Sequence, residues 1–150
     1  MKLPRGICLA GAILALAATS QTRAGDPAVN PTGTWELKTL NASNQPPAIL
    51  KLKLANGAVT GTLSRNAGAK IEQLPLEDTR LQGSELAFTV HVYTLHYEHN
   101  VLQPTDTNQV TVATYHGLIT GDTIQGQVEK KSWREGASRT LAWEARRVRP

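Results

Sequence analysis

Three short stretches of the chain repeat one pattern, and this pattern constrains the fold more than any other feature. They are LANGAVTGTL from Leu54, LQGSELAFTV from Leu81 and ITGDTIQGQV from Ile119. In each, an apolar residue precedes a pair of small turn residues, and alternation of apolar and polar residues then resumes. Gly, Asn and Asp tolerate the positive φ angles of two-residue hairpin turns, and period-two alternation is typical of half-buried strands. Each stretch is therefore predicted to be a β-hairpin.

The same alternation continues through most of the remaining chain, and no long window shows a helical stripe of apolar residues. The predicted strands cover residues 34–40, 48–55, 58–65, 70–77, 79–82, 85–97, 108–120, 122–131 and 139–148. Short antiparallel strands joined by hairpins close into a barrel or pair as a sandwich, and consecutive hairpins favour the barrel. The predicted fold is all-β, an antiparallel up-and-down β-barrel of about eight strands, a size that holds packed side chains or one small ligand.

Two details of the pattern predict local features. Gly61 and Gly126 fall in phase with apolar neighbours, which indicates a sharply bent strand or close interior packing. The longest connection, HNVLQPTDTN at residues 99–108, is polar and contains proline, so we expect a surface loop there.

The first residues of the chain have the order of a secretory signal peptide. A basic start at residues 1–5 precedes an apolar run at residues 7–18, and Thr22 and Ala24 then provide small residues before Gly25. The run is shorter than the roughly 20 apolar residues that span a bilayer. We expect a cleaved signal peptide at residues 1–24, a flexible lead-in at 25–32 and a single domain at 33–150. The expected location is secreted or periplasmic, with no membrane span.

Cysteine and charge exclude several classes of protein. Cys8 is the only cysteine and lies in the apolar run, so the expected mature chain has neither a disulfide nor a thiolate nucleophile. Without Lys2, Arg5 and Arg23 the chain keeps 13 basic residues against 12 acidic ones, and the excess lies at residues 146–149. Because nucleic-acid binding needs a basic stripe along the molecule, no nucleic-acid partner is expected.

The start of the first strand resembles a known signature. Gly33-Thr34-Trp35 is similar to the Gly-x-Trp motif that opens the first strand of lipocalins and avidin-like barrels, and NGAVTGTL at residues 56–63 resembles the second hairpin of the avidin-like group. The chain as a whole also resembles small secreted bacterial proteins with hairpin-rich sequences. The resemblance implies the barrel fold and names no ligand.

The same resemblance implies a structural role for three residues. In lipocalins the signature tryptophan closes one end of the barrel and packs against an arginine of the last strand. The resemblance therefore implies that Trp35 caps one end of this barrel against Arg146 or Arg147. Stacking of a planar guanidinium on an indole ring provides the physical reason for such a pair.

The stretch HVYTLHYEHN at residues 91–100 contains three of the four histidines. His96 and Glu98 share one strand face, and His116 comes from the following strand. Such a set could supply three ligands to a tetrahedral metal ion, or, together with His91, imidazoles for acid–base chemistry near neutral pH.

The hairpin geometry argues against the metal site. Centring the connection near Gln103 places His116 opposite Val90, six residues along the strand from His96. At roughly 3.4 Å per residue this separation is about 20 Å, too far for shared ligation. No metal and no cofactor are therefore expected.

Motifs for catalysis are missing from the sequence: there is no nucleophile elbow, phosphate-binding glycine loop or zinc-binding helix motif. The main hypothesis is a non-enzymatic binding barrel for a small or apolar ligand. The candidate ligand-lining residues are Tyr93, His96, Tyr97, Tyr115 and His116. One alternative is a protein-interaction or inhibitor-like barrel with a side-chain-filled interior. The other is a barrel enzyme that uses His91, His96, Glu98 and His116 for acid–base chemistry.

Overall fold

The computed structural model describes residues 29–41, 45–93, 96–98, 101–103, 110–132 and 136–149, with the backbone alone at 96–98 and 101–103. The expected signal peptide, residues 1–24, and residues 25–28 of the expected lead-in lie outside these ranges. Among the described residues, no helix has the length and apolar character needed to cross a membrane.

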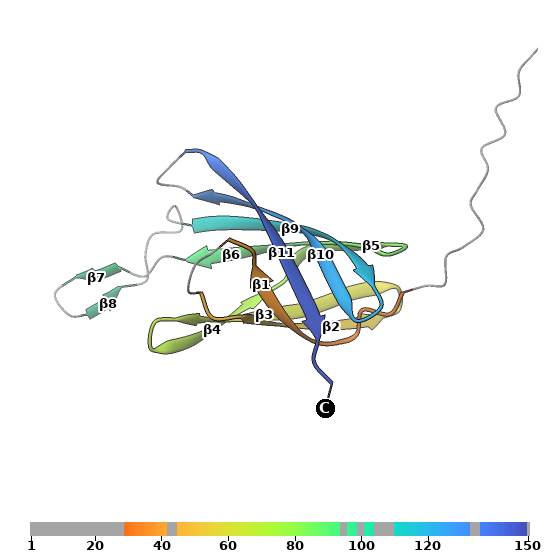
Figure 1. Ribbon diagram of the computed structural model, residues 1–150. Coiled ribbons are helices and arrows are strands. Elements are labelled where there is room, and N and C mark those ends of the chain that lie inside the picture. Colours follow the sequence, from red (N-terminus) through yellow and green to blue (C-terminus); the bar gives the residue numbers. More distant parts are fainter. Residues whose placement is uncertain are drawn as a thin grey trace, which may run out of the picture.

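The described chain is built from strands joined by turns and short connections (Figure 1). The strands are β1 (Gly33–Thr39), β2 (Ala48–Ala55), β3 (Ala58–Ala67), β4 (Lys70–Pro75), β5 (Glu77–Gln82), β6 (Glu85–Tyr93), β7 (His96–Glu98), β8 (Val101–Gln103), β9 (Val110–Thr120), β10 (Thr123–Ser132) and β11 (Ser138–Arg147). The sequence pattern placed most of these strands within one or two residues of their ends.

Nine of the strands form one antiparallel sheet that curls into a nearly closed barrel (Figure 1). Their order is β4-β3-β2-β1-β11-β10-β9-β6-β5, and β7 pairs separately with β8. The first strand pairs with the last, with Trp35 opposite Arg147 and Leu37 opposite Ala145. The other neighbours in the barrel follow one another in sequence, apart from the β7–β8 hairpin between β6 and β9, which is the up-and-down order. The predicted all-β antiparallel barrel is confirmed.

The two edges of the sheet, β4 and β5, are halves of one bent strand. β4 pairs with β3 and β5 pairs with β6, and only Leu76 separates the two halves. The segment continues along β3 after β4 has ended, because the Leu76 amide donates to the Gly61 carbonyl at 3.1 Å and the Thr79 hydroxyl donates to the Val59 carbonyl. Counted in this way, the wall consists of eight strands, as the sequence predicts.

The two ends of the barrel differ in how the strands connect. The turns at Gly57, Gly83 and Gly121, one in each repeated stretch, lie at the end where β1 begins and β11 finishes, which we call the closed end. Asn56 and Gly57 both have positive φ, at 52° and 76°, as a type I′ hairpin turn requires. The opposite end, which we call the mouth, carries the longer connections at residues 40–47, 94–109 and 133–137.

The interior is filled by the apolar side chains of the alternating pattern. They include Trp35, Leu37, Leu50, Leu52, Leu63, Leu74, Leu86, Phe88, Val90, Ala113, Tyr115, Ile124, Val128, Trp143 and Ala145. Three rings pack together: Phe88 stacks on Tyr115 with ring centroids 4.7 Å apart, and Trp143 meets both rings edge-on. These are the arrangements that the quadrupoles of aromatic rings favour.

Glycines allow the bulky Trp143 to fit against the wall. Gly117 and Gly126 are direct partners on β9 and β10. A Cβ atom on Gly117 would lie 2.7 Å from the Trp143 ring, and one on Gly126 would lie 1.8 Å from the His116 carbonyl oxygen. That same oxygen accepts a hydrogen bond from the Trp143 indole N–H at 3.1 Å. The position of Gly126 in phase with apolar residues therefore reflects close interior packing, as the sequence indicates.

Trp35 and Arg147 lie together at the closed end. Trp35 is fully buried, its indole N–H donates to the Pro31 carbonyl at 2.9 Å, and the Arg147 guanidinium carbon lies 4.2 Å from the ring centroid. Arg147 also donates to the carbonyls of Asn30 and Thr32, which ties the chain ahead of β1 across this end.

Arg146 does not share this contact with Trp35. Its side chain is 77% exposed and pairs with Glu144 at 2.6 Å. Of the two arginines that the resemblance offered, the structure therefore places Arg147 over Trp35.

The histidine-rich segment departs from the predicted strand at residues 85–97. β6 ends at Tyr93, and residues 96–98 instead form β7, which pairs with β8 inside the expected loop. This hairpin projects beyond the barrel (Figure 1). The predicted register was also wrong, because His116 lies opposite Ala87 and not opposite Val90. The position of a loop centre does not determine register when the connection contains its own hairpin.

The cap gives a first prediction. Replacing Arg147 by lysine should lower the free energy of unfolding by about 1–3 kcal/mol, because an ammonium group can neither stack on the Trp35 ring nor bind two carbonyls in the same fork. The matched change Arg146→Lys, at an exposed position, should cost less than about 0.5 kcal/mol. Urea denaturation of the two variants measures both values, and equal losses would contradict the assigned role of Arg147.

The interior glycine gives a second prediction. Gly126→Ala should lower the free energy of unfolding by about 3 kcal/mol or more, because the added methyl group would overlap backbone atoms of β9 that are held by the sheet. The control Gly83→Ala adds a methyl group where no atom lies within 4 Å and should cost only the roughly 1–2 kcal/mol of a left-handed backbone. Thermal and urea unfolding distinguish the two. If Gly126→Ala is no less stable than Gly83→Ala, the close packing at β9 is refuted.

Candidate functional site

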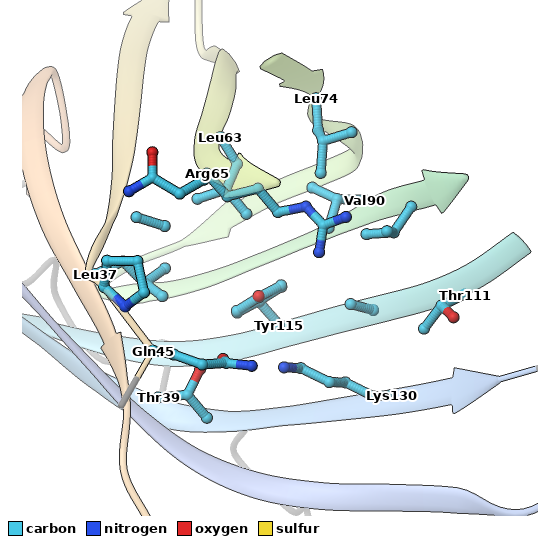
Figure 2. A pocket seen from close by; sticks show the side chains of 15 residues that line it. Leu37, Thr39, Gln45, Leu63, Arg65, Leu74, Val90, Thr111, Tyr115 and Lys130 are labelled. Atoms are coloured by element: carbon cyan, nitrogen blue, oxygen red, sulfur yellow. The ribbon is translucent and has the colours of Figure 1, made fainter. Parts of the chain in front are cut away.

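A pocket of about 250 Å³ lies inside the barrel at the mouth (Figure 2). Side chains of seven strands and of the connection between β1 and β2 surround it. Its lining residues are Leu37, Thr39, Gln45, Pro46, Ala48, Leu63, Arg65, Asn66, Leu74, Val90, Val92, Thr111, Ala113, Tyr115 and Lys130. The apolar members belong to the core, so the pocket is the part of the barrel interior that side chains leave unfilled.

Two cations reach this interior because strand alternation continues to the ends of β3 and β10. On β3 the inward phase runs through Val59 and Leu63 to Arg65, and on β10 it runs through Val128 to Lys130. Since every second residue of a strand points to the same face, both basic side chains are directed inward. The strand order places β3 and β10 on opposite walls, with three strands between them in either direction when β4 and β5 count as one.

Arg65 is anchored by an acidic neighbour. Its Nε and Nη2 atoms lie 2.8 Å and 2.7 Å from the Glu72 carboxylate oxygen Oε2 across the β3–β4 ladder. The two side chains are 37% and 24% exposed, so the pair is partly shielded from water. Because a guanidinium carries five N–H donors, this contact leaves donors of Arg65 for another acceptor.

Lys130 is half-buried and has no comparable partner. Among the residues that the structure describes, no carboxylate forms an ion pair with it. Burial lowers the pKa of the Lys130 ammonium, and the positive charge of Arg65 lowers it further. Both causes disfavour the charged form of Lys130 in the unliganded pocket.

Tyr115 lines the pocket and joins it to the aromatic cluster. Its ring stacks on Phe88, and the residue is only 5% exposed to solvent. Burial raises the pKa of the Tyr115 phenol to about 12, although the nearby Arg65 charge acts in the opposite direction. The phenol therefore stays protonated at neutral pH and offers one O–H donor.

The charges that line the pocket have one sign. Arg65 and Lys130 are the charged members of the lining, and Glu72 compensates one of them from outside it. Arg139 is the register partner of Lys130 on β11, which brings a further basic residue to this end of the sheet. Figure 2 shows Arg65 and Lys130 entering the pocket from opposite sides, with Tyr115 between them. The arrangement is suited to an anionic group with an apolar attachment.

A wider hollow, of about 560 Å³, lies on the outer face and does not have these properties. Its lining includes Arg80, Glu85, His116, Leu118 and Gln127 from β5, β6, β9 and β10. It is shallow and open to solvent, and it mixes acidic and basic groups. Ligand sites are concave and enclose most of the ligand surface, so the smaller pocket inside the barrel is the better candidate.

The structure describes the side chains of three of the five predicted ligand-lining residues. Tyr115 lines the mouth pocket, whereas Tyr93, with 47% exposure, and His116 lie on the outer face. The side chains of His96 and Tyr97 are outside the described part of the chain.

The two described histidines of the acid–base hypothesis, His91 and His116, lie apart on the outer face. His91 lies opposite Val112 on β9, four residues from His116, so the two imidazoles are separated by about 14 Å along the strand. His91 instead pairs with Glu77 at 3.1 Å on the outer face. The described ranges contain no group of three residues that could hold a metal ion. The side chains of His96 and Glu98 fall outside these ranges.

Sequence reasoning missed Arg65 and Lys130, although a signal for both was present. Each occupies the position at which the next apolar residue of the inward phase would fall, two residues after Leu63 and Val128. A cation in that phase is directed into the barrel unless the strand ends first. The alternation of each strand also carries the position of the histidines. His91 is three residues from the buried Phe88, and His116 is one residue from the buried Tyr115, so both histidines fall in the outward-facing phase.

Comparison of the chain with family models, with curated proteins and with solved structures gives no match. The barrel is established by the strand pairing of this chain. Because one fold supports many activities, the function has to be argued from the pocket and its side chains.

The buried phenol gives a third prediction, for alkaline pH. The folded-state pKa of Tyr115, about 12, exceeds the unfolded value of 10.0, so its contribution to stability is fully present below pH 10 and is lost as the pH rises through 12. Over this window the wild type should lose about 2–3 kcal/mol of unfolding free energy more than Tyr115→Phe does. Urea denaturation of both proteins at pH 9, 10, 11 and 12 measures the difference. Parallel curves for the two proteins would contradict the burial of an ionisable group here.

Proposed function

We propose that this protein is a secreted or periplasmic, non-enzymatic binding barrel that holds a small ligand in the pocket at its mouth. The observation that carries the proposal is the asymmetry of the interior. Trp35 and Arg147 occupy the closed end, an aromatic cluster packs the interior, and a pocket of about 250 Å³ remains at the other end.

The size and the walls of the pocket support a small ligand. Pockets for drug-sized ligands have volumes of roughly 300–1,000 Å³, so a pocket of 250 Å³ suits a somewhat smaller molecule. Its lining combines aliphatic side chains with polar groups, among them Gln45, Thr39 and Thr111. Ligand sites combine apolar surface with polar groups that fix the orientation of the ligand.

The chemistry of the lining favours binding over catalysis. A general base needs a pKa near the working pH, whereas the Tyr115 phenol has a pKa of about 12. His91 and His116, the described members of the acid–base hypothesis, lie on the outer face away from the pocket. The location outside the cytoplasm is supported by the basic, apolar and small segments of residues 1–24.

The direct test is native mass spectrometry of the full chain expressed in and purified from its own source. We expect a mass larger than that of the polypeptide by a small molecule, and loss of this increment under denaturing conditions. A native mass equal to the polypeptide mass, together with capture of a protein partner, would overturn the small-ligand proposal in favour of the protein-interaction barrel.

A matched pair of variants locates the ligand. Ala113 lies in the pocket wall, and Ala87 lies on the outer face of the neighbouring strand. Ala113→Leu should fill part of the pocket and remove the mass increment, whereas Ala87→Leu adds the same atoms outside and should leave it. If both variants keep the increment, the ligand does not bind in the mouth pocket. Circular dichroism of both variants shows whether each is folded.

A further inference from the structure

We infer that the ligand is an amphipathic organic anion, whose single acidic head group lies between Arg65 and Lys130 and whose apolar body lies on the aliphatic walls of the pocket. The inference rests on the proposed function and specifies the chemistry of the ligand. It follows from three features of the pocket: its charge, the positions of the two cations and the character of its walls.

The charge of the pocket calls for an anion. Arg65 and Lys130 are both partly buried and line the same pocket, and a buried charge is costly unless it is paired and hydrogen-bonded. Glu72 binds Nε and Nη2 of Arg65 through one oxygen, which leaves the remaining guanidinium donors available. Lys130 has no ion-pair partner within the described residues, so an incoming acidic group would satisfy both cations.

The positions of the two cations define where the acidic group binds. β3 and β10 are on opposite walls of the eight-stranded ring, so the side chains of Arg65 and Lys130 enter the pocket from opposite sides. Figure 2 shows both side chains directed into the same space. An anion between them would connect walls that no backbone hydrogen bond joins. Gln45 and Asn66 line the same region and add amide N–H donors.

The walls require that the anion has an apolar body. The pocket is bounded below the cations by Leu63, Leu74, Val90 and Ala113, all buried, and by the ring of Tyr115. An inorganic anion would satisfy the cations but leave these surfaces in contact with water. A purely apolar ligand would cover the walls but would bury the Lys130 charge without a partner and leave the remaining Arg65 donors unused. An organic acid with one head group satisfies both parts of the site.

Three probes with the same eight-carbon chain test this inference by isothermal titration calorimetry on the mature protein. They are octanoate, octan-1-ol and octylamine at neutral pH. Octanoate should bind at least about tenfold more tightly than octan-1-ol, because hydrogen bonds to charged groups are stronger than neutral ones. Octylamine should bind more weakly than either, since its ammonium group would meet two cations.

Variants of the basic residues identify the groups responsible. Lys130→Met keeps an unbranched side chain one atom shorter and removes its charge, and it should weaken octanoate binding about fivefold or more while leaving octan-1-ol binding unchanged. The matched control Lys131→Met removes the adjacent, outward-facing charge of the same strand and should change neither affinity. Glu72→Gln removes the competing negative charge beside Arg65 and should strengthen octanoate binding.

The outcomes separate this inference from the proposed function. Equal affinity for octanoate and octan-1-ol, or tighter binding of octylamine, would overturn the anionic head group while leaving a small-ligand barrel in place. An equal loss of octanoate affinity in Lys130→Met and Lys131→Met would also overturn it. If none of the three probes binds, the inference is wrong, and native mass spectrometry of the source protein decides the proposed function independently. Thermal unfolding of each variant shows whether it is folded, and Lys130→Met should be at least as stable as the wild type because it removes a half-buried charge.

Discussion

The antiparallel pairing of β1 with β11 is the contact on which the rest of the structure depends. Without it, the strands would form an open sheet with two exposed edges. The apolar side chains of the alternating pattern would then lie on one face of that sheet with no interior to bury them. The register of this pairing sets Trp35 opposite Arg147, so the same contact that curls the sheet also closes one end. The pocket lies at the opposite end of the interior, the mouth.

Much of this architecture could be predicted from local pattern. The hairpin turns are specified by Asn56-Gly57, Gly83 and Gly121, because positive φ angles are accessible to few residue types. The strands between them are specified by alternation, since one face must be buried. The order of the barrel follows once each hairpin pairs neighbours in sequence. These features depend on residues that are close together in the chain, so the local sequence is enough to predict them.

The features that could not be predicted depend on distant parts of the chain. The pocket forms where inward side chains from β3, β9 and β10 fail to fill the space between them, and no single strand reveals that volume. The register of β6 against β9 is set by the packing of Phe88 on Tyr115 and by the shape of the connection between the strands, whereas the length of the connection is compatible with several registers. The predicted pairing of His116 with Val90 was wrong for this reason.

The bent strand formed by β4 and β5 has a consequence for the motions of the barrel. In the described part of the chain, β4 pairs only with β3, and β6 beyond Thr89 pairs only with β9, so the wall between Lys70–Leu74 and Val90–Tyr93 is a seam without cross-strand hydrogen bonds. Local opening of a protein follows the boundaries at which fewest interactions are broken. We therefore expect the barrel wall to open transiently at this seam, next to Leu74 and Val90, while the hairpins stay intact. Amide hydrogens on the free edge of β4 would exchange with solvent well before those of β9 and β10, and a molecule could pass between the walls without any strand leaving its partner.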